Sequence, residues 1–184
     1  HFEHAARWYQ LLYDHRSNTD REHDPELHRC ITRCQTIALL APRLRGACIF
    51  RSNQKERIAW PLDPLLDWAV QTLPQADYAD LPLMKTLFAG YQALESPDEP
   101  EYFARFRDGL LAAPACFTRA DRRDLLLVAI NFCSKRYNTG DTAWLDTQLE
   151  LYDYGLREAL LLENNWVTGY TFLNIGTLAL IGRR

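Results

Sequence analysis

Apolar residues recur at the three- and four-residue spacing of an α-helix along most of the chain, most clearly from Thr118 to Arg184. This stretch predicts three consecutive helices joined by short turns, over about 121–138, 142–162 and 169–182. The first has an apolar stripe whose members lie about one turn apart: Leu126, Ile130, Cys133 and Tyr137. The second has a similar stripe, formed by Leu145, Leu149, Tyr152, Leu156 and Ala159 or Leu160.

Polar residues and glycine mark the predicted ends of these helices. Thr118 and Asp121 have the spacing of a capping box, in which each side chain satisfies an unpaired backbone N–H group. Gly140 suits the left-handed position after a helix, and Asp141 or Thr142 is expected to cap the second helix. Residues 163–165 are expected to form a turn, after which Thr168 caps the last helix.

The last predicted helix differs from the others because it has almost no polar face. Its apolar members are Phe172, Leu173, Ile175, Leu178, Ala179, Leu180 and Ile181. A helix that is apolar on all sides is expected to be buried on all sides, yet at about 14 residues it is too short for a membrane span, which needs about 20. This helix is expected to be covered by the first half of the chain, by a second subunit in a homo-oligomer, or by further chain.

The rest of the chain also reads as helices separated by proline-containing breaks. Helices are predicted over about 2–16, 25–41, 65–73, 81–94 and 101–112, with a further short helix around 47–50. Pro42 is expected to end the second of these, and the pairs Asp24–Pro25 and Asp63–Pro64 are expected to start helices. The sequence therefore predicts an all-α fold of eight or nine helices without a convincing strand.

Short turns between helices of this length predict a right-handed array of antiparallel helical hairpins, forming a single domain over residues 1–184. Hairpins recur every 35–45 residues or so, although no residue pattern repeats cleanly. The segment Trp144–Tyr152 is similar to the tetratricopeptide pattern Trp-x2-Leu-Gly-x2-Tyr, but it lacks the Leu-Gly step and has its tyrosine one place late. The chain thus resembles the tetratricopeptide-like helical-repeat superfamily in general organisation.

A second resemblance covers only about the last third of the chain. Segments 131–133, 151–152, 160–165 and 171–175 resemble uncharacterised bacterial helical-repeat proteins. This resemblance implies a helical-repeat fold and no particular activity. The start at His1, inside an apolar pattern, and the single Met84 predict that the chain is a piece of a longer protein.

Composition narrows the function classes. The net charge of −3 gives no broad electrostatic case for nucleic acid, and no long apolar run predicts a membrane span. Five cysteines are an odd number, and Cys30, Cys34 and Cys133 lie in helical apolar stripes. They are expected to be free buried thiols in a reducing compartment, which predicts a cytoplasmic protein.

A metal site is the main chemical alternative. All five histidines lie in the first 28 residues, namely His1, His4, His15, His23 and His28. Cys30 and Cys34 follow at helical i,i+4 spacing, which could place two thiolates on one helix face. The expected apolar surroundings of both thiols and the absence of a second ligand pair favour no metal and no cofactor. No nucleotide-binding, hydrolase or metalloprotease motif is present in the sequence.

Polar side chains inside apolar helices are the candidate binding residues. Asn131, Lys135 and Asn138 share one helix face, and Asn174 lies in the nearly apolar last helix together with Tyr170. Asparagine has both a donor and an acceptor, so it can bind the main chain of an extended peptide. The alternative is that the first three form a solvated face and Asn174 bonds a neighbouring turn.

The resulting expectation is a non-catalytic scaffold that binds a protein or peptide. A nucleic-acid-binding repeat protein is the first alternative, resting on the short basic clusters Lys135–Arg136, Arg122–Arg123 and Arg43/Arg45. Nearby acidic residues weaken that alternative, because phosphate binding needs a continuous basic stripe. The second alternative is a metal-dependent helical enzyme that uses the histidine-rich N-terminal region.

Overall fold

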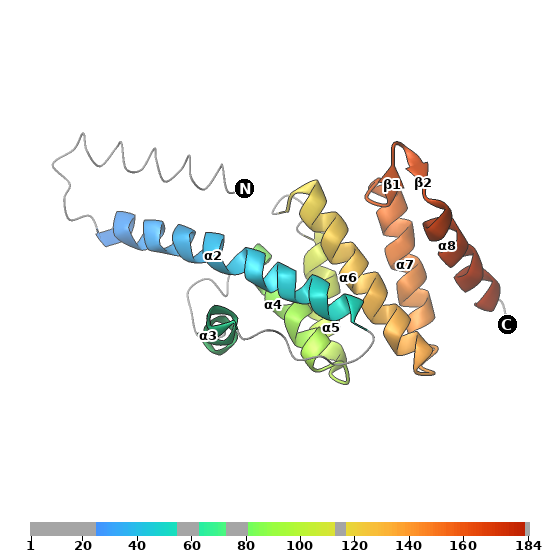
Figure 1. Ribbon diagram of the computed structural model, residues 1–184, viewed down its shortest axis with the longest axis horizontal. Coiled ribbons are helices and arrows are strands. Elements are labelled where there is room, and N and C mark those ends of the chain that lie inside the picture. Colours follow the sequence, from blue (N-terminus) through green and yellow to red (C-terminus); the bar gives the residue numbers. More distant parts are fainter. Residues whose placement is uncertain (1–24, 55–62, 73–80, 113–116, 183–184) are drawn as a thin grey trace.

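The computed structural model describes residues 25–54, 63–72, 81–112 and 117–182. These residues form seven α-helices and one pair of short strands (Figure 1). The elements are α2 (Pro25–Asn53), α3 (Pro64–Thr72), α4 (Pro82–Glu95), α5 (Pro100–Ala112), α6 (Arg119–Asn138), α7 (Trp144–Arg157), β1 (Leu162–Glu163), β2 (Trp166–Val167) and α8 (Gly169–Ile181). The all-α prediction is confirmed, and the helix predicted over 2–16 lies outside the described residues.

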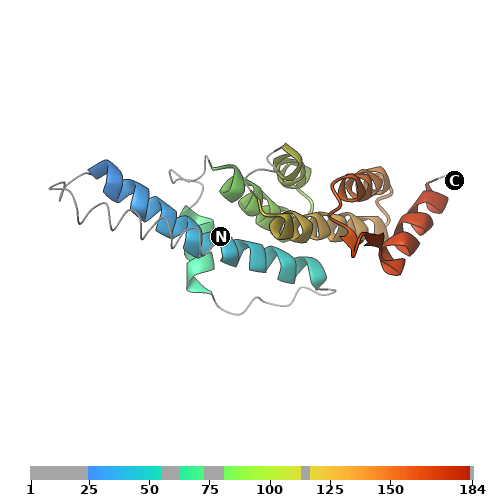
Figure 2. The same cartoon turned by 90° about the horizontal axis from the view of Figure 1, so that it is seen from above.

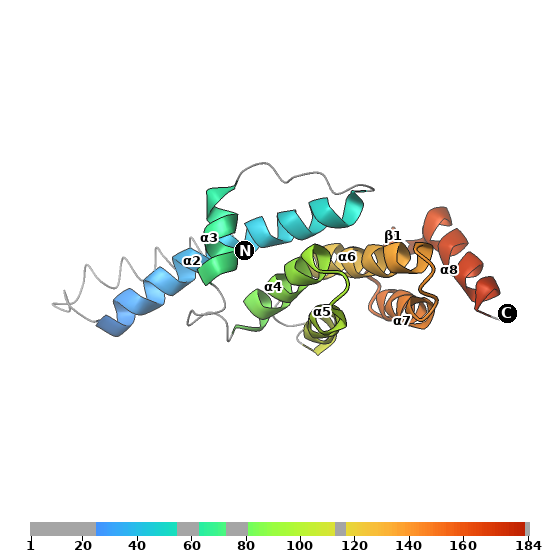
Figure 3. The same cartoon turned by 90° about the horizontal axis from the view of Figure 1, so that it is seen from below.

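The helices lie in three layers (Figures 2 and 3). The second half of α2 runs across one side of α4 and α6, which form the middle layer. α5 and α7 lie on the opposite side of that layer, each beside the helix that precedes it in the chain. α3 packs against α2, and α8 follows α7 at one end of the molecule (Figure 1).

The prediction that α2 ends before Pro42 is wrong. α2 continues through Pro42 to Asn53, so the short helix expected around 47–50 is its last part. A proline inside a helix costs about 3 kcal/mol. Beyond the proline, however, Leu44, Ala47 and Cys48 are completely buried against the middle layer. Burying one leucine side chain stabilises a fold by about 1.5–3 kcal/mol, so this packing outweighs the local cost.

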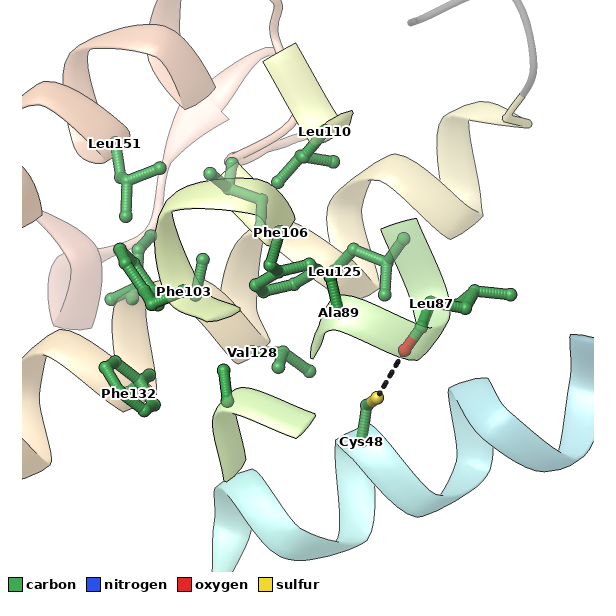
Figure 4. Close-up of a cluster of buried hydrophobic side chains, with 14 of the residues drawn as sticks. Cys48, Leu87, Ala89, Phe103, Phe106, Leu110, Leu125, Val128, Phe132 and Leu151 are labelled. Carbon is green, nitrogen blue, oxygen red and sulfur yellow. Dashed lines mark hydrogen bonds between the residues drawn. The ribbon is translucent and has the colours of Figure 1, made fainter. Parts of the chain in front are cut away.

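Aromatic residues join α5, α6 and α7 in the core, and Figure 4 shows Phe103 and Phe132 among the buried side chains. The rings of Phe103 and Phe132 stack with centroids 4.6 Å apart, and Trp144 meets both rings edge-on at 4.9 and 5.3 Å. Leu125, Leu126, Val128, Ala129, Ile130 and Cys133 of α6 are also buried, so α6 is central to the core. The burial expected for Leu126, Ile130 and Cys133 is confirmed.

Several predicted helix ends are confirmed by side-chain hydrogen bonds. The Thr118 hydroxyl accepts from the Asp121 N–H at 3.1 Å, and Asp121 accepts from the Thr118 N–H at 3.2 Å, which completes the capping box. The Asp63 carboxylate accepts from the backbone N–H groups of Leu65 and Leu66 at the start of α3. Gly140 adopts a φ of 99° after α6, as expected from its freedom to take left-handed conformations.

The start of α7 differs from its prediction. Ala143 occupies the N-cap position without a side-chain hydrogen bond, so neither Asp141 nor Thr142 caps this helix. Asp141 instead accepts a hydrogen bond of 2.8 Å from the indole N–H of Trp144. That bond fixes the tryptophan whose ring packs in the aromatic core.

The end of α7 also differs, because the helix stops at Arg157 instead of residue 162. Ala159 has a φ of 56°, and the N–H groups of Leu160 and Leu161 both bond the Gly155 carbonyl. This closing turn buries both leucines against the core. Their burial, which depends on the tertiary fold, accounts for a helix end that periodicity did not predict.

Candidate interaction surface

A short hairpin connects α7 to α8 and brings Trp166 to the surface. Asn164 and Asn165 have φ values of 51° and 66°, a conformation that asparagine tolerates better than most residues. They form the turn expected at 163–165, and β1 pairs antiparallel with β2, which the sequence did not predict. The Thr168 hydroxyl accepts from the Thr171 N–H at 3.2 Å, which confirms the predicted cap of α8.

α8 carries exposed apolar residues, so the described part of this chain does not bury it on all sides, and its cover by a second subunit or by further chain stays a prediction. Tyr170, Phe172, Leu173 and Leu180 are 77, 74, 65 and 70% exposed, and the adjacent Trp166 is 78% exposed. These five residues are called the α8 surface below. Of the helix itself only Leu178 is buried. α8 lies at the end of the layered structure, so α7 covers one side of it and leaves the opposite side open (Figures 1 and 3).

The α8 surface is uncharged along the whole helix. Residues 169–181 contain no Asp, Glu, Lys or Arg. The largest apolar patch on a typical monomeric protein covers about 300–600 Å² and is often a contact surface. This absence of charge predicts burial, and it is the signal by which Phe172, Leu173 and Leu180 could have been proposed as interface residues.

A small polar group lies between α8 and α7. The Asn174 side-chain amide donates to the Tyr152 hydroxyl at 3.5 Å, which is a long hydrogen bond. Burial raises the pKa of Tyr152, and the nearby Tyr170 raises it further, whereas the Asn174 bond lowers it. The group therefore presents a neutral phenol beside the α8 surface, with Asn174 turned toward α7.

The other predicted binding residues lie elsewhere, on α6. The Asn131 amide donates to the Asn53 side-chain oxygen at 3.2 Å, and the Lys135 ammonium donates to the Arg51 carbonyl at 2.9 Å. Both bonds hold the last turn of α2 against α6. Partial burial lowers the pKa of Lys135, because removal of water disfavours its charge.

The five predicted binding residues thus fall into separate groups. Asn131 and Lys135 contact the end of α2, Asn138 is exposed at the end of α6, and Asn174 lies beside Tyr152, close to Tyr170. Only Tyr170 belongs to the α8 surface. Their role in peptide binding stays a prediction.

The basic clusters face carboxylates. Arg45 pairs with Asp121, Arg122 with Glu158 at 2.8 Å, and Arg123 with Glu163 at 2.7 Å. Arg136 likewise pairs with Asp98 at 2.7 Å, and Arg43 lies 3.6 Å from Asp63. A guanidinium held by a carboxylate is a poor phosphate ligand, so these contacts favour a structural role over a nucleic-acid interface.

The cysteines of α2 are also placed differently from the prediction. Cys30 and Cys34 are exposed, not buried, whereas Cys133 is buried as expected. Among the described residues, no group of three or more His, Cys, Asp or Glu side chains could hold a metal ion. His1, His4, His15 and His23 lie outside the described residues, and His28 is exposed on α2.

Comparisons with protein-family models, curated proteins and solved structures found no match. The described helices include none that is both long enough and apolar enough to cross a membrane, since α8 is apolar but has only 13 residues.

Proposed function

We propose that this protein is a non-catalytic scaffold of helical hairpins, and that it binds another protein through the α8 surface. The observation that carries the proposal is the exposure of Trp166, Tyr170, Phe172, Leu173 and Leu180 on α8 and the hairpin before it. Covering apolar area stabilises a complex by about 25 cal/mol per Å² before the entropic costs of association. Aromatic residues dominate the binding energy of many protein interfaces.

The arrangement of the preceding helices supports the hairpin array. α4 and α5 form one pair and α6 and α7 a second, each joined by a short connection and packed closely along its length. In such arrays the turns and exposed helix faces supply contact surfaces, while the chemistry of a catalytic cleft is not needed. A tetratricopeptide-like, right-handed repeat remains part of this proposal, as does a cytoplasmic location.

A protein partner fits the α8 surface better than nucleic acid does. Backbone phosphates need cationic side chains, which residues 169–181 do not contain. Stacking of single-stranded bases would use the aromatic rings, but such sites combine the rings with a positively charged groove. An apolar protein face supplies the complementary contact without charge.

The test compares the full chain with a surface variant in a nuclease-treated lysate. Phe172→Ser and Leu180→Ser together remove two exposed apolar side chains without opening the core, since both are at least 70% exposed. We expect the wild-type chain to retain a bound protein, whether another protein or itself, and the double variant to lose at least about 90% of it, equivalent to about 1.4 kcal/mol.

Leu39→Ser is the matched control, because Leu39 is an exposed leucine (44%) on α2, away from α8. It should retain the partner fully. Equal retention by all three proteins would place binding on another surface. Complete release by nuclease would favour the nucleic-acid alternative and overturn the proposal.

A further inference from the structure

We propose that the partner of the α8 surface is a second copy of this chain, and that the two α8 helices pair antiparallel about a two-fold axis at Gly176. This inference rests on the proposed function, because it assumes that the α8 surface binds protein. It adds the identity of the partner and the residue at which the two copies cross.

Gly176 is the first reason, since nothing inside one copy requires a glycine there. A Cβ atom added to Gly176 would meet no atom within 4 Å. By contrast, the added atom at Gly90 would lie 3.0 Å from the Phe106 ring, and at Gly155 it would lie 2.6 Å from Leu126. A glycine inside a helix costs about 1 kcal/mol relative to alanine. Close approach of a second backbone offsets that cost at an outward-facing position.

The residues on either side of Gly176 are the second reason, because they complement themselves. Phe172 precedes Gly176 by four residues and Leu180 follows it by four. In an antiparallel pair centred on Gly176, Phe172 of each copy therefore meets Leu180 of the other. Such reciprocal contacts define a two-fold interface. Leu173 and Ala179 are related in the same way, at three residues on either side.

The charge and area of the surface are the third reason. Two identical charged faces repel each other, but α8 contains no charged residue over 169–181. An aromatic side chain buries about 150–250 Å², so Trp166 and Phe172 at about three-quarters exposure offer on the order of 300 Å², whereas Tyr170 lies two residues from Phe172 and so on another side of the helix. Leu173, Leu180 and the small residues between them add to this. A standard interface buries about 800 Å² on each partner, so this smaller contact should give a weak dimer that forms only as the protein concentration rises.

Access is the fourth reason. α8 lies at one end of the layered structure, and its open side faces away from α7 in all three views (Figures 1, 2 and 3). No described helix other than α7 packs closely on α8, so its open side is available to a second copy.

Disulfide cross-linking tests the geometry directly. Gly176→Cys places a thiol at the proposed axis, and Gly169→Cys is the matched control at another glycine whose added Cβ meets nothing within 4 Å. In the pair, the two copies of position 169 lie about 20 Å apart (rise 1.5 Å per residue), beyond the reach of a disulfide. Both variants are made with Cys30, Cys34 and Cys116 replaced by serine.

We expect mild oxidation to give at least about ten times more covalent dimer from Gly176→Cys than from Gly169→Cys, because a disulfide needs Cβ atoms about 3.8 Å apart. Equal yields from the two variants, or none from either, would overturn the two-fold pairing at Gly176.

Sedimentation equilibrium provides the second measurement, since a cysteine at the axis could itself disturb the contact. We expect the wild-type chain to dimerise with increasing concentration and Leu180→Asp to weaken dimerisation at least about tenfold, because each copy would bury an unpaired carboxylate. Leu39→Asp should dimerise like the wild type.

Failure of this inference is distinguishable from failure of the proposed function. A wild-type chain that stays monomeric at about 100 μM, well above the concentration at which specific interfaces form, overturns self-pairing. If Phe172→Ser with Leu180→Ser still abolishes capture of another protein, the proposed function stands with a different partner. If both measurements are negative, both are overturned.

Discussion

At the scale of single residues, the four cysteines of the described part of the chain fall into two chemical groups. Cys30 and Cys34 are exposed on the first half of α2, whereas Cys48 and Cys133 are buried. Burial raises the pKa of each of the latter two thiols from 9.0 to about 12. Cys48 also donates to the Leu87 carbonyl at 3.7 Å (Figure 4). The spacing of these cysteines in helical stripes did not distinguish the groups.

The first prediction concerns thiol reactivity at pH 8. We expect Cys30 and Cys34 of the folded protein to react with a charged maleimide within minutes, since both are exposed, and Cys48 and Cys133 to react only after denaturation. Peptide mapping by mass spectrometry measures all four. Rapid labelling of Cys48 in the native protein would contradict the packing of α2 on the middle layer.

The second prediction concerns alkaline stability. In the unfolded chain the two thiols ionise near 9, but in the fold they ionise near 12, so their contribution to stability is full below about pH 9 and is lost as the pH rises toward 12. At pH 10 the loss is about 1.4 kcal/mol per thiol. Urea unfolding of Cys48→Ala with Cys133→Ala should show a smaller decrease between pH 8 and 10 than the wild type. Parallel decreases would show that the thiols are not protected.

At the scale of helices, close backbone packing joins α4 to α5. A Cβ atom added at Gly109 of α5 would lie 2.3 Å from the Thr86 hydroxyl oxygen of α4. Thr86 cannot easily move, because it is 2% exposed and its hydroxyl donates to the Pro82 carbonyl at 2.8 Å. Only glycine at this position permits the two helices to pack as they do.

The third prediction tests this contact. Gly109→Ala should destabilise the protein by about 1–3 kcal/mol through overpacking, measured by urea unfolding. Gly46→Ala on α2 is the control, because its added Cβ atom meets nothing within 4 Å. It should stabilise the protein by about 0.5–1 kcal/mol through helix propensity. Equal effects of the two substitutions would argue against close packing of α4 on α5.

The contact of α6 with the end of α2 is the second relation between helices that can be tested. Lys135→Met removes the hydrogen bond to the Arg51 carbonyl but keeps the length of the side chain. As the fourth prediction, we expect a loss of about 1 kcal/mol and faster amide hydrogen exchange in the last turn of α2. Asn138→Ala, at an exposed position on the same helix, is the control and should change neither. Unchanged amide exchange in Lys135→Met would show that Lys135 does not stabilise the end of α2, and Lys135 would again be a candidate for binding a partner.

At the scale of the whole molecule, burial falls from the centre of the fold toward α8. α6 buries seven residues, among them Leu125, Phe132 and Cys133, whereas α8 buries only Leu178. Local opening costs little free energy where few apolar contacts must break. The α8 surface therefore lies on a helix that makes few buried contacts with the rest of the fold.

The fifth prediction follows from this gradient. In dilute protein, the amides of α8 should exchange much faster than those of α6, measured by hydrogen exchange with mass spectrometry. If the two α8 helices pair as proposed, protection of α8 should increase with protein concentration while that of α6 stays constant. Equal protection of α6 and α8 in the dilute monomer would contradict the gradient.

Sequence patterns predicted the local features well. The capping box of Thr118 and Asp121, the cap at Thr168 and the left-handed Gly140 all depend on residues within a few positions of one another. The apolar stripe of α6 predicted that Leu126, Ile130 and Cys133 are buried, because apolar residues at helical spacing form the face of a helix that packs against the core. For the binding surface, the sequence showed an uncharged last helix but could not show which side of it is covered.

The features that the sequence did not predict depend on contacts between residues far apart in the chain. Pro42 would end an isolated helix, but burial of Leu44 and Ala47 on α4 and α6 carries α2 past it. Burial of Leu160 and Leu161 ends α7 early. The sequence also could not show that α8 lies at the end of the fold, where Phe172 and Leu180 are exposed within one chain. The sequence alone determined that the chain is helical and where most helices begin, because propensity and capping act within one or two turns. Only the tertiary structure decided which apolar faces are covered, because that depends on the free energy of packing residues far apart in the chain.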